Sequence, residues 1–445
     1  MRLSAWLLFA VLSGALVCGA AVRPHYGGTL RVEMHAAPAS LDPGTPAIAP
    51  LVFEPLVRLD NAGMPQPWLA VSWQRDANAR RWQFRLRPGV KFHDGFVLAP
   101  ASVVSSLQSA LPGLNVAAAG DTIVIRADRS MPDLLLELAD RAFISAQTAD
   151  GGLVGTGPFR LTAWETGRHA TLAAYNEYWG GRPFLDAIDI QMGRLRREQL
   201  LDLEIGKADV VEFSPADVRR AENSSRPVWS SANANLIALI FQRGHATDPR
   251  TREALALSLD RSAMYNVLLQ KQGEISGALL PQWMSGYAFT FPFAPAIAQA
   301  RALTGPVPPP SRTLTLAYDA AIPNGKSLAE RVAVNARDAG LTVQVAQQPP
   351  PDLRLVEIMI RSISPSCAMG ELAADLGLDA PPPSYSPEAL YGAERRLLET
   401  FTVIPLFHIP EMYGVSARVH SGQPSPISRL GGWHFEAVWL SAGAP

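Results

Sequence analysis

The chain has 445 residues, of which 39 are basic and 40 acidic, so its formal net charge is -1 at neutral pH. Hydrophobic residues make up 48% and charged residues 18% of the sequence, which supports a packed core and excludes a wholly disordered protein. The balanced charge gives no general attraction to polyphosphate and argues against a nucleic-acid-binding protein. At about 150 residues per domain, the length favours roughly three domains.

Residues 1–21 are typical of a secretory signal peptide. Arg2 supplies a positive start, Ala5–Val17 is an apolar run, and the small residues at 19–21 offer a cleavage site. Two alternatives stay open, an uncleaved membrane anchor and a lipid anchor on Cys18. All three interpretations predict a mature protein outside the cytoplasm, in the periplasm or a comparable space. No later stretch is long and apolar enough to span a membrane.

The next part of the chain, up to residue 152, is rich in strand signals. Alternating polar and apolar residues predict strands at Thr29–Met34, Leu51–Leu59, Trp82–Leu86 and Asp121–Ala127. The segment WQFRLRPGVKFHDG, which begins at Trp82, predicts a hairpin with its turn at His93-Asp94-Gly95. Pro100–Leu111 predicts a helix with proline in its first turn.

After Gly151-Gly152, strands and helices alternate. Strands are predicted at Phe159–Trp164, Ala170–Tyr175, Ile188–Met192, Asp209–Phe213 and Asn235–Gln242. Arg196–Ile205 predicts a short helix that ends at Gly206. A second helix is predicted over Asp248–Leu259, because Asp248 can cap it and Pro249 suits its first position. Ser262–Gln270 continues as helix.

The region after residue 313 predicts a βαβ unit. A strand from Leu314 (LTLAY) precedes a helix over Lys326–Ala339, which Gly340 ends, and Leu341–Ala346 forms the second strand. Such a unit implies parallel strands joined by a right-handed crossover. Leu353–Ile360 predicts a further strand.

Motifs that carry catalysis or bind a metal are absent from the sequence. It contains no H-E-x-x-H, C-x-x-C or G-x-S-x-G pattern. Ala320–Ser327 (AAIPNGKS) resembles a phosphate-binding loop, but its first glycine is replaced and Pro323 removes a needed N–H. Cys367 is alone once the signal is removed, so no intramolecular disulfide is expected. We therefore expect neither an enzyme nor a cofactor or metal site.

Several segments together resemble the family 5 extracellular solute-binding proteins of ABC transporters, which include dipeptide-, oligopeptide- and nickel-binding proteins. The segments, in family order, are GGTLRVEM with the later LDP, FEPLVRLDNAGMPQPWLAVSW, WQFRLRPGVKFHDGFVL, TGPFRLTAWETGRHATLAAYNEYWGGRPFLDAIDI, DPRTREALALSLDRSAMYNVLLQ, LLPQW, IPLFHIPEMYGV and GGWHFEAVWL. The resemblance implies an α/β fold of the periplasmic-binding-protein type (type II, cluster C). Two main lobes would flank a hinge, with an extra strand-rich lobe.

The resemblance also implies a division of the chain. Residues 1–21 would be the signal peptide and 22–50 the first part of lobe I. The remaining parts would be 51–152 for the strand-rich lobe II, 153–245 for lobe I again, 246–415 for lobe III with the βαβ unit, and 416–445 for the return to lobe I. The chain is short for the family, with apparent deletions after Asp42 and between Ala110 and Gly155.

The ligand is expected in the cleft between lobes I and III. Peptide binders carry there an acidic segment for the peptide amino terminus, and this chain has Arg361–Met369 (RSISPSCAM) instead. Arg361 would pair with a ligand carboxylate, with the hydroxyls of Ser362 and Ser364 beside it; a plain surface position is the open alternative for Arg361. Further candidates are Trp283, Tyr287, His408 and Tyr413, for each of which a plain core position is an open alternative.

The resemblance predicts the function of an extracytoplasmic solute-binding protein of an ABC importer. It would capture a peptide or other small polar organic ligand as a monomer and deliver it to a membrane permease. Two alternatives remain: a protein that keeps the fold but has an interaction or regulatory role without transport, and a secreted hydrolase with residues spread along the chain.

Overall fold

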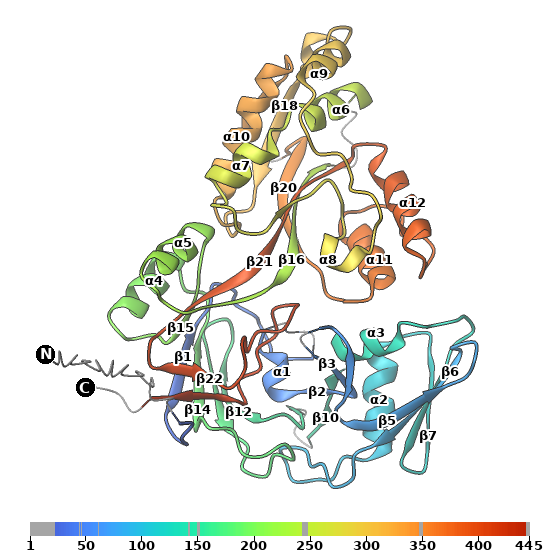
Figure 1. Ribbon diagram of the computed structural model, residues 1–445, viewed down its shortest axis with the longest axis vertical. Helices are drawn as coiled ribbons and strands as arrows, with labels where there is room; N and C mark the ends of the chain where they lie inside the picture. Colours follow the sequence, from blue (N-terminus) through green and yellow to red (C-terminus); the bar gives the residue numbers. More distant parts are fainter. Residues whose placement is uncertain are drawn as a thin grey trace, which may run out of the picture.

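The computed structural model describes residues 23–43, 45, 47–60, 62–140, 143–148, 152–242, 248–346 and 350–441. Two long strands, β16 (Val228–Phe241) and β21 (Val403–Val415), join a lower and an upper half of the molecule (Figure 1). We call the part of the lower half around β1 and β12–β15 lobe I, the part around β5–β8 lobe II, and the upper half lobe III. The predicted signal peptide and Cys18 lie outside the described residues.

One mixed sheet runs through lobes I and III. In the described residues its order is β12-β13-β14-β1-β15-β21-β16-β20-β18-β19, with β17 paired to β21. The other strands of this sheet are β1 (Thr29–Glu33), β12 (Phe159–Glu165), β13 (His169–Ala174), β14 (Ala187–Gln191), β15 (Val210–Glu212), β17 (Glu274–Ile275), β18 (Thr313–Tyr318), β19 (Thr342–Val345) and β20 (Leu353–Met359). Strand β1 lies parallel between β14 and β15.

The strands β16 and β21 form the connection between the two halves. They pair antiparallel over most of their length, and their register shifts between Ser230 and Asn233, again before Asn235, and near Ile237. Such irregularities bend and twist a strand pair. Below them, the ring of Phe213 lies against Gly414 of β21, where a β-carbon would be 1.9 Å from the ring Cζ. Glycine is therefore the one residue type that lets this ring and strand approach so closely.

Lobe I is built from both ends of the described chain. Its buried core contains Leu30 near the start and Trp433 and Phe435 near the end. Strands β22 (Val419–Ser421) and β23 (Val438–Leu440) pair antiparallel, and helices α4 (Arg196–Glu204) and α5 (Pro215–Asn223) lie beside the sheet (Figure 1). Helix α5 begins in a capping box between Ser214 and Asp217.

A buried carboxylate ties three segments of lobe I together. Asp209 accepts hydrogen bonds from Nε and Nη2 of Arg31, each at 2.9 Å, and from Nε and Nη2 of Arg418, at 2.6 and 2.7 Å. Burial opposes ionisation, but the bonds from Arg418 and Arg31 outweigh it and hold the pKa of Asp209 below its usual value. The carboxylate therefore stays charged and anchors β1 to the returning C-terminal segment.

Lobe II is a separate four-stranded antiparallel sheet with two helices. Its order is β5-β6-β8-β7, and its elements are β5 (Ala70–Arg75), β6 (Arg81–Leu86), β7 (Asn115–Ala119), β8 (Thr122–Arg126), α2 (Pro100–Ala110) and α3 (Leu134–Asp140). The predicted turn at His93–Gly95 is confirmed by the bond from Gly95 N to Phe92 O. The predicted hairpin was wrong in its pairing: β6 pairs with β5 and β8, because Arg87-Pro88-Gly89 directs the chain away from the sheet.

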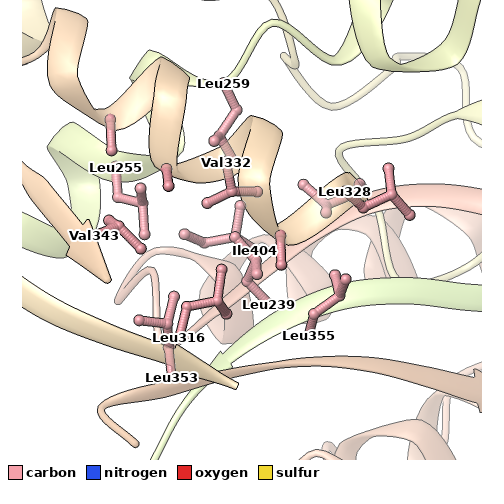
Figure 2. Close-up of a cluster of buried hydrophobic side chains, with 14 of the residues drawn as sticks. Leu239, Leu255, Leu259, Leu316, Leu328, Val332, Val343, Leu353, Leu355 and Ile404 are labelled. Carbon is pink, nitrogen blue, oxygen red and sulfur yellow. The ribbon is translucent and has the colours of Figure 1, made fainter. Parts of the chain in front are cut away.

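Lobe III contains the predicted βαβ unit. Strands β18 and β19 are parallel and α10 (Gly325–Asp338) connects them, ending before Gly340 at a positive φ of 76°. Helix α6 (Pro249–Ser258) starts as predicted, with the Asp248 side chain accepting from Arg250 N. Leucine and valine side chains of α6, α10 and the sheet form one buried cluster, labelled in Figure 2.

The remaining elements are short or lie on the other side of lobe III. They are α1 (Ala49–Val52), β2 (Glu54–Pro55), β3 (Val57–Leu59), β4 (Pro65–Pro67), β9 (Phe143–Ile144), β10 (Ala146–Gln147), β11 (Leu153–Val154), α7 (Arg261–Val267), α8 (Gln282–Ser285), α9 (Ile297–Thr304), a 3-10 turn (Pro309–Arg312), α11 (Pro365–Asp375) and α12 (Pro387–Leu398). The single strand predicted over Leu51–Leu59 was wrong, since a turn of helix with Pro50 near its start covers Ala49–Val52 and the strand that follows ends at Pro55. The domain boundaries predicted from the sequence stay a prediction.

Candidate ligand-binding site

A cavity of about 1130 Å³ lies where the three lobes meet. Residues from five distant stretches line it: within 43–60, within 101–110 of α2, within 139–153, within 359–371 at the end of β20 and on α11, and within 423–434 of the returning C-terminal segment. Ligand pockets for small organic molecules are commonly a few hundred to a thousand Å³ in volume. The cavity is therefore large enough for a solute of that size.

Helix α2 of lobe II forms one wall of the cavity. Val103 and Leu107 point into the lobe II core and are fully buried, which leaves a face of small residues on the other side of the helix. The serines of α2 that line the cavity are Ser102, Ser105, Ser106 and Ser109. The Ser106 hydroxyl is already used, because it donates to the carbonyl oxygen of Ser145 at 2.9 Å.

The end of β20 and helix α11 form a second wall. Arg361 lines the cavity, and its side chain is 48% exposed with Nη2 2.9 Å from Oδ2 of Asp375. Glu371, on the same helix, also lines the cavity. An exposed ion pair contributes little to stability, so the Arg361 guanidinium can accept a ligand carboxylate at small cost.

The floor of the cavity holds Arg58 beside His434. Arg58 Nη1 lies 2.7 Å from Oε1 of Glu436, and Nη2 lies 2.5 Å from Nδ1 of His434. A guanidinium can only donate, so Nδ1 of His434 accepts and the ring proton is on Nε2. Burial, together with the positive charge of Arg58, lowers the pKa of His434 to about 3. The histidine is therefore a neutral hydrogen-bond donor at physiological pH.

A buried carboxylate supports this floor from below. The carboxylate of Glu54 accepts hydrogen bonds from the Trp68 indole and the Thr156 hydroxyl, both at 2.7 Å, and from Tyr178 and Trp179, both at 2.8 Å. Burial raises the pKa of Glu54, while these donors favour the charged form. The Arg58 guanidinium stacks 4.0 Å from the centre of the Trp68 ring. The Trp68 ring, which is held by the Glu54 carboxylate, therefore fixes the position of Arg58.

Two contacts connect lobe III to the lower half beside the cavity. The Arg429 guanidinium lies 5.5 Å from the centre of the Trp283 ring in lobe III and within 4 Å of a β-carbon placed on Gly63. The Ser364 hydroxyl, at the start of α11, donates to Oδ2 of Asp133 in lobe II at 3.4 Å. Burial raises the pKa of Asp133, and the hydrogen bond from Ser364 opposes this shift. The two halves therefore touch on either side of the cavity.

The structure places the residues predicted from the sequence in different surroundings. Arg361 lines the cavity, and Trp283 reaches it indirectly through Arg429. Ser362 and Ser364 are fully buried, the first accepting from the backbone N–H of the second. They and the remaining candidates are not among the described lining residues, and their role in ligand binding stays a prediction.

Of the other three candidates, His408 and Tyr413 are buried inside the protein, and Tyr287 is partly buried against a hydrophobic cluster of lobe III. His408 is fully buried, with Nε2 2.9 Å from the carbonyl oxygen of Leu279. Tyr413 is 2% exposed and bonds Oε2 of Glu411 at 2.5 Å. Tyr287 donates to Oε2 of Glu394, also at 2.5 Å.

Sequence analysis missed Arg58, Arg429, His434 and the serines of α2. The only available signal was the regular spacing of Ser102, Ser105, Ser106 and Ser109, which share one helix face. The two arginines and the histidine lie in the quoted family segments or beside them, without a local motif.

Nothing in the described part of the chain assembles a metal site: no group of three or more His, Cys, Asp or Glu side chains there could hold an ion. Among the same residues, no helix has both the length and the apolar character required to cross a bilayer.

The sequence matches the model of the bacterial extracellular solute-binding proteins, family 5 (Middle), over residues 64–361. This match covers more than half of the 445 residues. The chain belongs to this family. The family is one of binding proteins, and the resemblance described from the sequence is confirmed.

Curated relatives of this solute-binding protein are named for different ligands. The nickel-binding protein NikA of Staphylococcus aureus is 24% identical over 236 residues, 49% of this chain and 48% of the relative. The probable D,D-dipeptide-binding periplasmic protein DdpA of Escherichia coli is 23% identical over 313 residues, 62% of this chain and 60% of the relative. These alignments span about half to three fifths of the relatives' length.

Solved structures support the fold of the solute-binding protein. The oligopeptide-binding protein AppA of Bacillus subtilis, solved with a nonapeptide, superposes with a TM-score of 0.78 at 16% identity, covering 94% of this chain and all of the other. The predicted periplasmic-binding-protein fold of type II is thereby confirmed, with its two main lobes, their connection and the additional strand-rich lobe.

Proposed function

We propose that this chain is the extracytoplasmic ligand-binding component of an ABC importer. It captures a peptide or another small polar organic ligand in the cavity and delivers it to membrane permease subunits. The observation that carries the proposal is the position of the cavity, whose lining comes from all three lobes and lies beside the β16–β21 connection. A ligand held there contacts both halves at once, so it stabilises the conformation in which the halves are close.

The family membership supports export as well as binding. The proposed mature protein begins near residue 22 and acts as a monomer outside the cytoplasm. The permease would distinguish the ligand-bound from the ligand-free protein by the distance between lobe III and the lower half. The chain's own task is then to bind and to change shape, with no covalent chemistry.

Native mass spectrometry of the protein as purified tests this proposal, because a tightly held solute travels with the chain. A mass increase that disappears after mild unfolding and refolding is the expected result. Adding the released solute back is expected to raise the melting temperature and to reduce the radius of gyration in small-angle scattering. A protein without bound solute, whose melting temperature and scattering no peptide or metabolite mixture changes, would contradict ligand capture and favour a non-transport interaction role.

A further inference from the structure

We infer that the cavity takes an anionic, hydroxyl-rich organic acid, such as a sugar acid, and that the serines of lobe II form part of its binding surface. This inference rests on the proposed function and names the class of ligand. Three features of the cavity support the inference: its guanidinium groups, the small number and the hydrogen bonds of its carboxylates, and a wall of hydroxyl groups.

Guanidinium groups stand on different sides of the cavity. Arg361 comes from the end of β20, Arg429 from the returning C-terminal segment and Arg58 from β3. Arg58 is held by Glu436 and by the Trp68 ring, so it is positioned before a ligand enters. Arginine presents parallel N–H donors that match a carboxylate. The arrangement suits a ligand that carries at least one carboxylate.

The described lining itself contains fewer carboxylates than guanidinium groups: Asp60 and Glu371, against three arginines. Two of the arginines have carboxylate partners outside this lining, since Arg361 pairs with Asp375 and Arg58 with Glu436. Asp60 is used within its own turn, since Oδ1 accepts from the backbone N–H groups of Ala62 and Met64 and Oδ2 from Gln66, all at 2.9 Å. The bond from Met64, with the others, lowers the pKa of Asp60 and keeps this carboxylate ionised in the turn.

The third feature is the hydroxyl wall of α2. In the described structure the side chains of Ser102 and Ser105 have no hydrogen-bond partner, although both line the cavity. The Nε2–H of neutral His434 adds a donor on the floor. Hydroxyl groups that donate and accept complement the hydroxyl groups of a polyol.

The same lining argues against a flat aromatic ligand. Phe143 is its single phenyl ring, and neither tryptophan nor tyrosine belongs to the described lining. A large aromatic macrocycle would therefore find one ring to stack against. The apolar part of the lining is aliphatic, with Leu59, Met359, Ile360 and Leu430 among its residues, and it can contact the carbon skeleton of a compact acid.

Paired probes test the inference: galacturonate against galactose, and gluconate against sorbitol, each by isothermal titration calorimetry and thermal shift. Each pair differs mainly in the carboxylate. The expected result is binding of at least one acid, with no measurable binding of its neutral partner. Arg361→Ala is expected to lower the affinity for that acid at least tenfold. The matched control is Arg354→Ala, an exposed arginine of the same strand outside the described lining, which is expected to leave affinity unchanged.

A second variant tests the contribution of lobe II. Ser105→Leu replaces an exposed hydroxyl with a bulky apolar group on the cavity wall. It is expected to lower the affinity for the acid at least tenfold without changing the melting temperature of the free protein. Equal binding of acid and neutral partner, an unchanged affinity in Arg361→Ala, or no binding of either acid would overturn the inference. A neutral or cationic solute found by native mass spectrometry would overturn it too, while leaving the proposed function intact. Absence of any bound solute would instead count against the proposed function.

Discussion

Ser364 of lobe III and Asp133 of lobe II form a hydrogen bond across the cavity edge, with 3.4 Å between Oγ and Oδ2. Each residue precedes a helix, α11 and α3 respectively, so the carboxylate also faces the positive end of α11. In the proposed opening of the cavity, lobes II and III separate and this contact would break. The contact would therefore favour the closed arrangement, independently of any ligand.

The first prediction concerns this contact. Asp133→Ala is expected to favour the open arrangement by about 1 kcal/mol, the value of one long hydrogen bond to a charged group, and so to increase the open population about fivefold. The radius of gyration of ligand-free protein, measured by small-angle scattering, should increase. Asp121→Ala, an exposed aspartate of lobe II, is the control. Identical scattering of the Asp133 variant and its parent would show that the contact has no influence on closure.

The second prediction concerns the carboxylate that anchors β1. Asp209→Asn is expected to lower the free energy of unfolding by about 2–4 kcal/mol, because two guanidinium groups lose their buried partner while remaining partly solvated. Since the pKa of Asp209 is lowered in the folded protein, its stabilisation is present above the unfolded value of about 4 and disappears as the pH falls through the folded value. Urea titrations at pH 7 and in acid measure both effects. A loss of similar size at both pH values would refute the ionic explanation.

The third prediction concerns Glu394, which is fully buried. Burial raises its pKa to about 7, although hydrogen bonds from Tyr287 and the backbone of Leu279 and Leu280 favour the charged form. The unfolded chain loses this proton near pH 4.5 and the folded chain near pH 7, so the group destabilises the fold increasingly over that range. At 1.36 kcal/mol per pKa unit, the penalty reaches about 3 kcal/mol.

Glu394→Gln removes this titration. Its unfolding free energy relative to the parent is therefore expected to rise between pH 4.5 and 7 and then to level. Comparing the two proteins at each pH cancels the contributions of other groups, including Glu357, whose pKa is raised by burial in the same direction. A difference that stays constant over this range would mean that Glu394 is ionised in the folded protein.

The fourth prediction concerns the close packing of Phe213 on β21. Gly414→Ala is expected to destabilise the protein by about 1–3 kcal/mol, since the new methyl group overlaps the ring. Gly370→Ala is the matched control, because this glycine lies in α11 with no atom within 4 Å of the added β-carbon. There alanine should be neutral or stabilising by about 1 kcal/mol. Chemical denaturation of both variants distinguishes them, and equal stability would contradict the packing argument.

The sequence predicted those elements whose signals are local. The helix over Pro100–Leu111 and the βαβ unit were correct, because Pro100 marks the start of the first helix and Gly340 the end of the second. Helices α11 and α12, which begin after Ser364 and Ser386, were not predicted from the sequence. In the structure these serines precede the first helical turn, where proline is well accommodated.

The cavity could not be predicted in the same way. Its walls come from Ser105, Arg361 and His434, which are separated by many residues and meet only through the packing of three lobes. Arg361 was found because the family resemblance directed attention to the end of that strand. His408, in contrast, lies on a strand whose side chains are buried on both faces, and a histidine inside such a strand has no sequence signal that separates a ligand contact from a core position.

The position of β1 between β14 and β15, with Trp433 and Phe435 in the same core as Leu30, has a consequence for biosynthesis. While the ribosome is still adding lobe III, the first lobe lacks its final aromatic residues and cannot complete its interior. Folding of that lobe must therefore wait until translation is almost finished. This delay is compatible with the proposed export of the chain, in which an extended polypeptide passes through a translocase before it becomes compact.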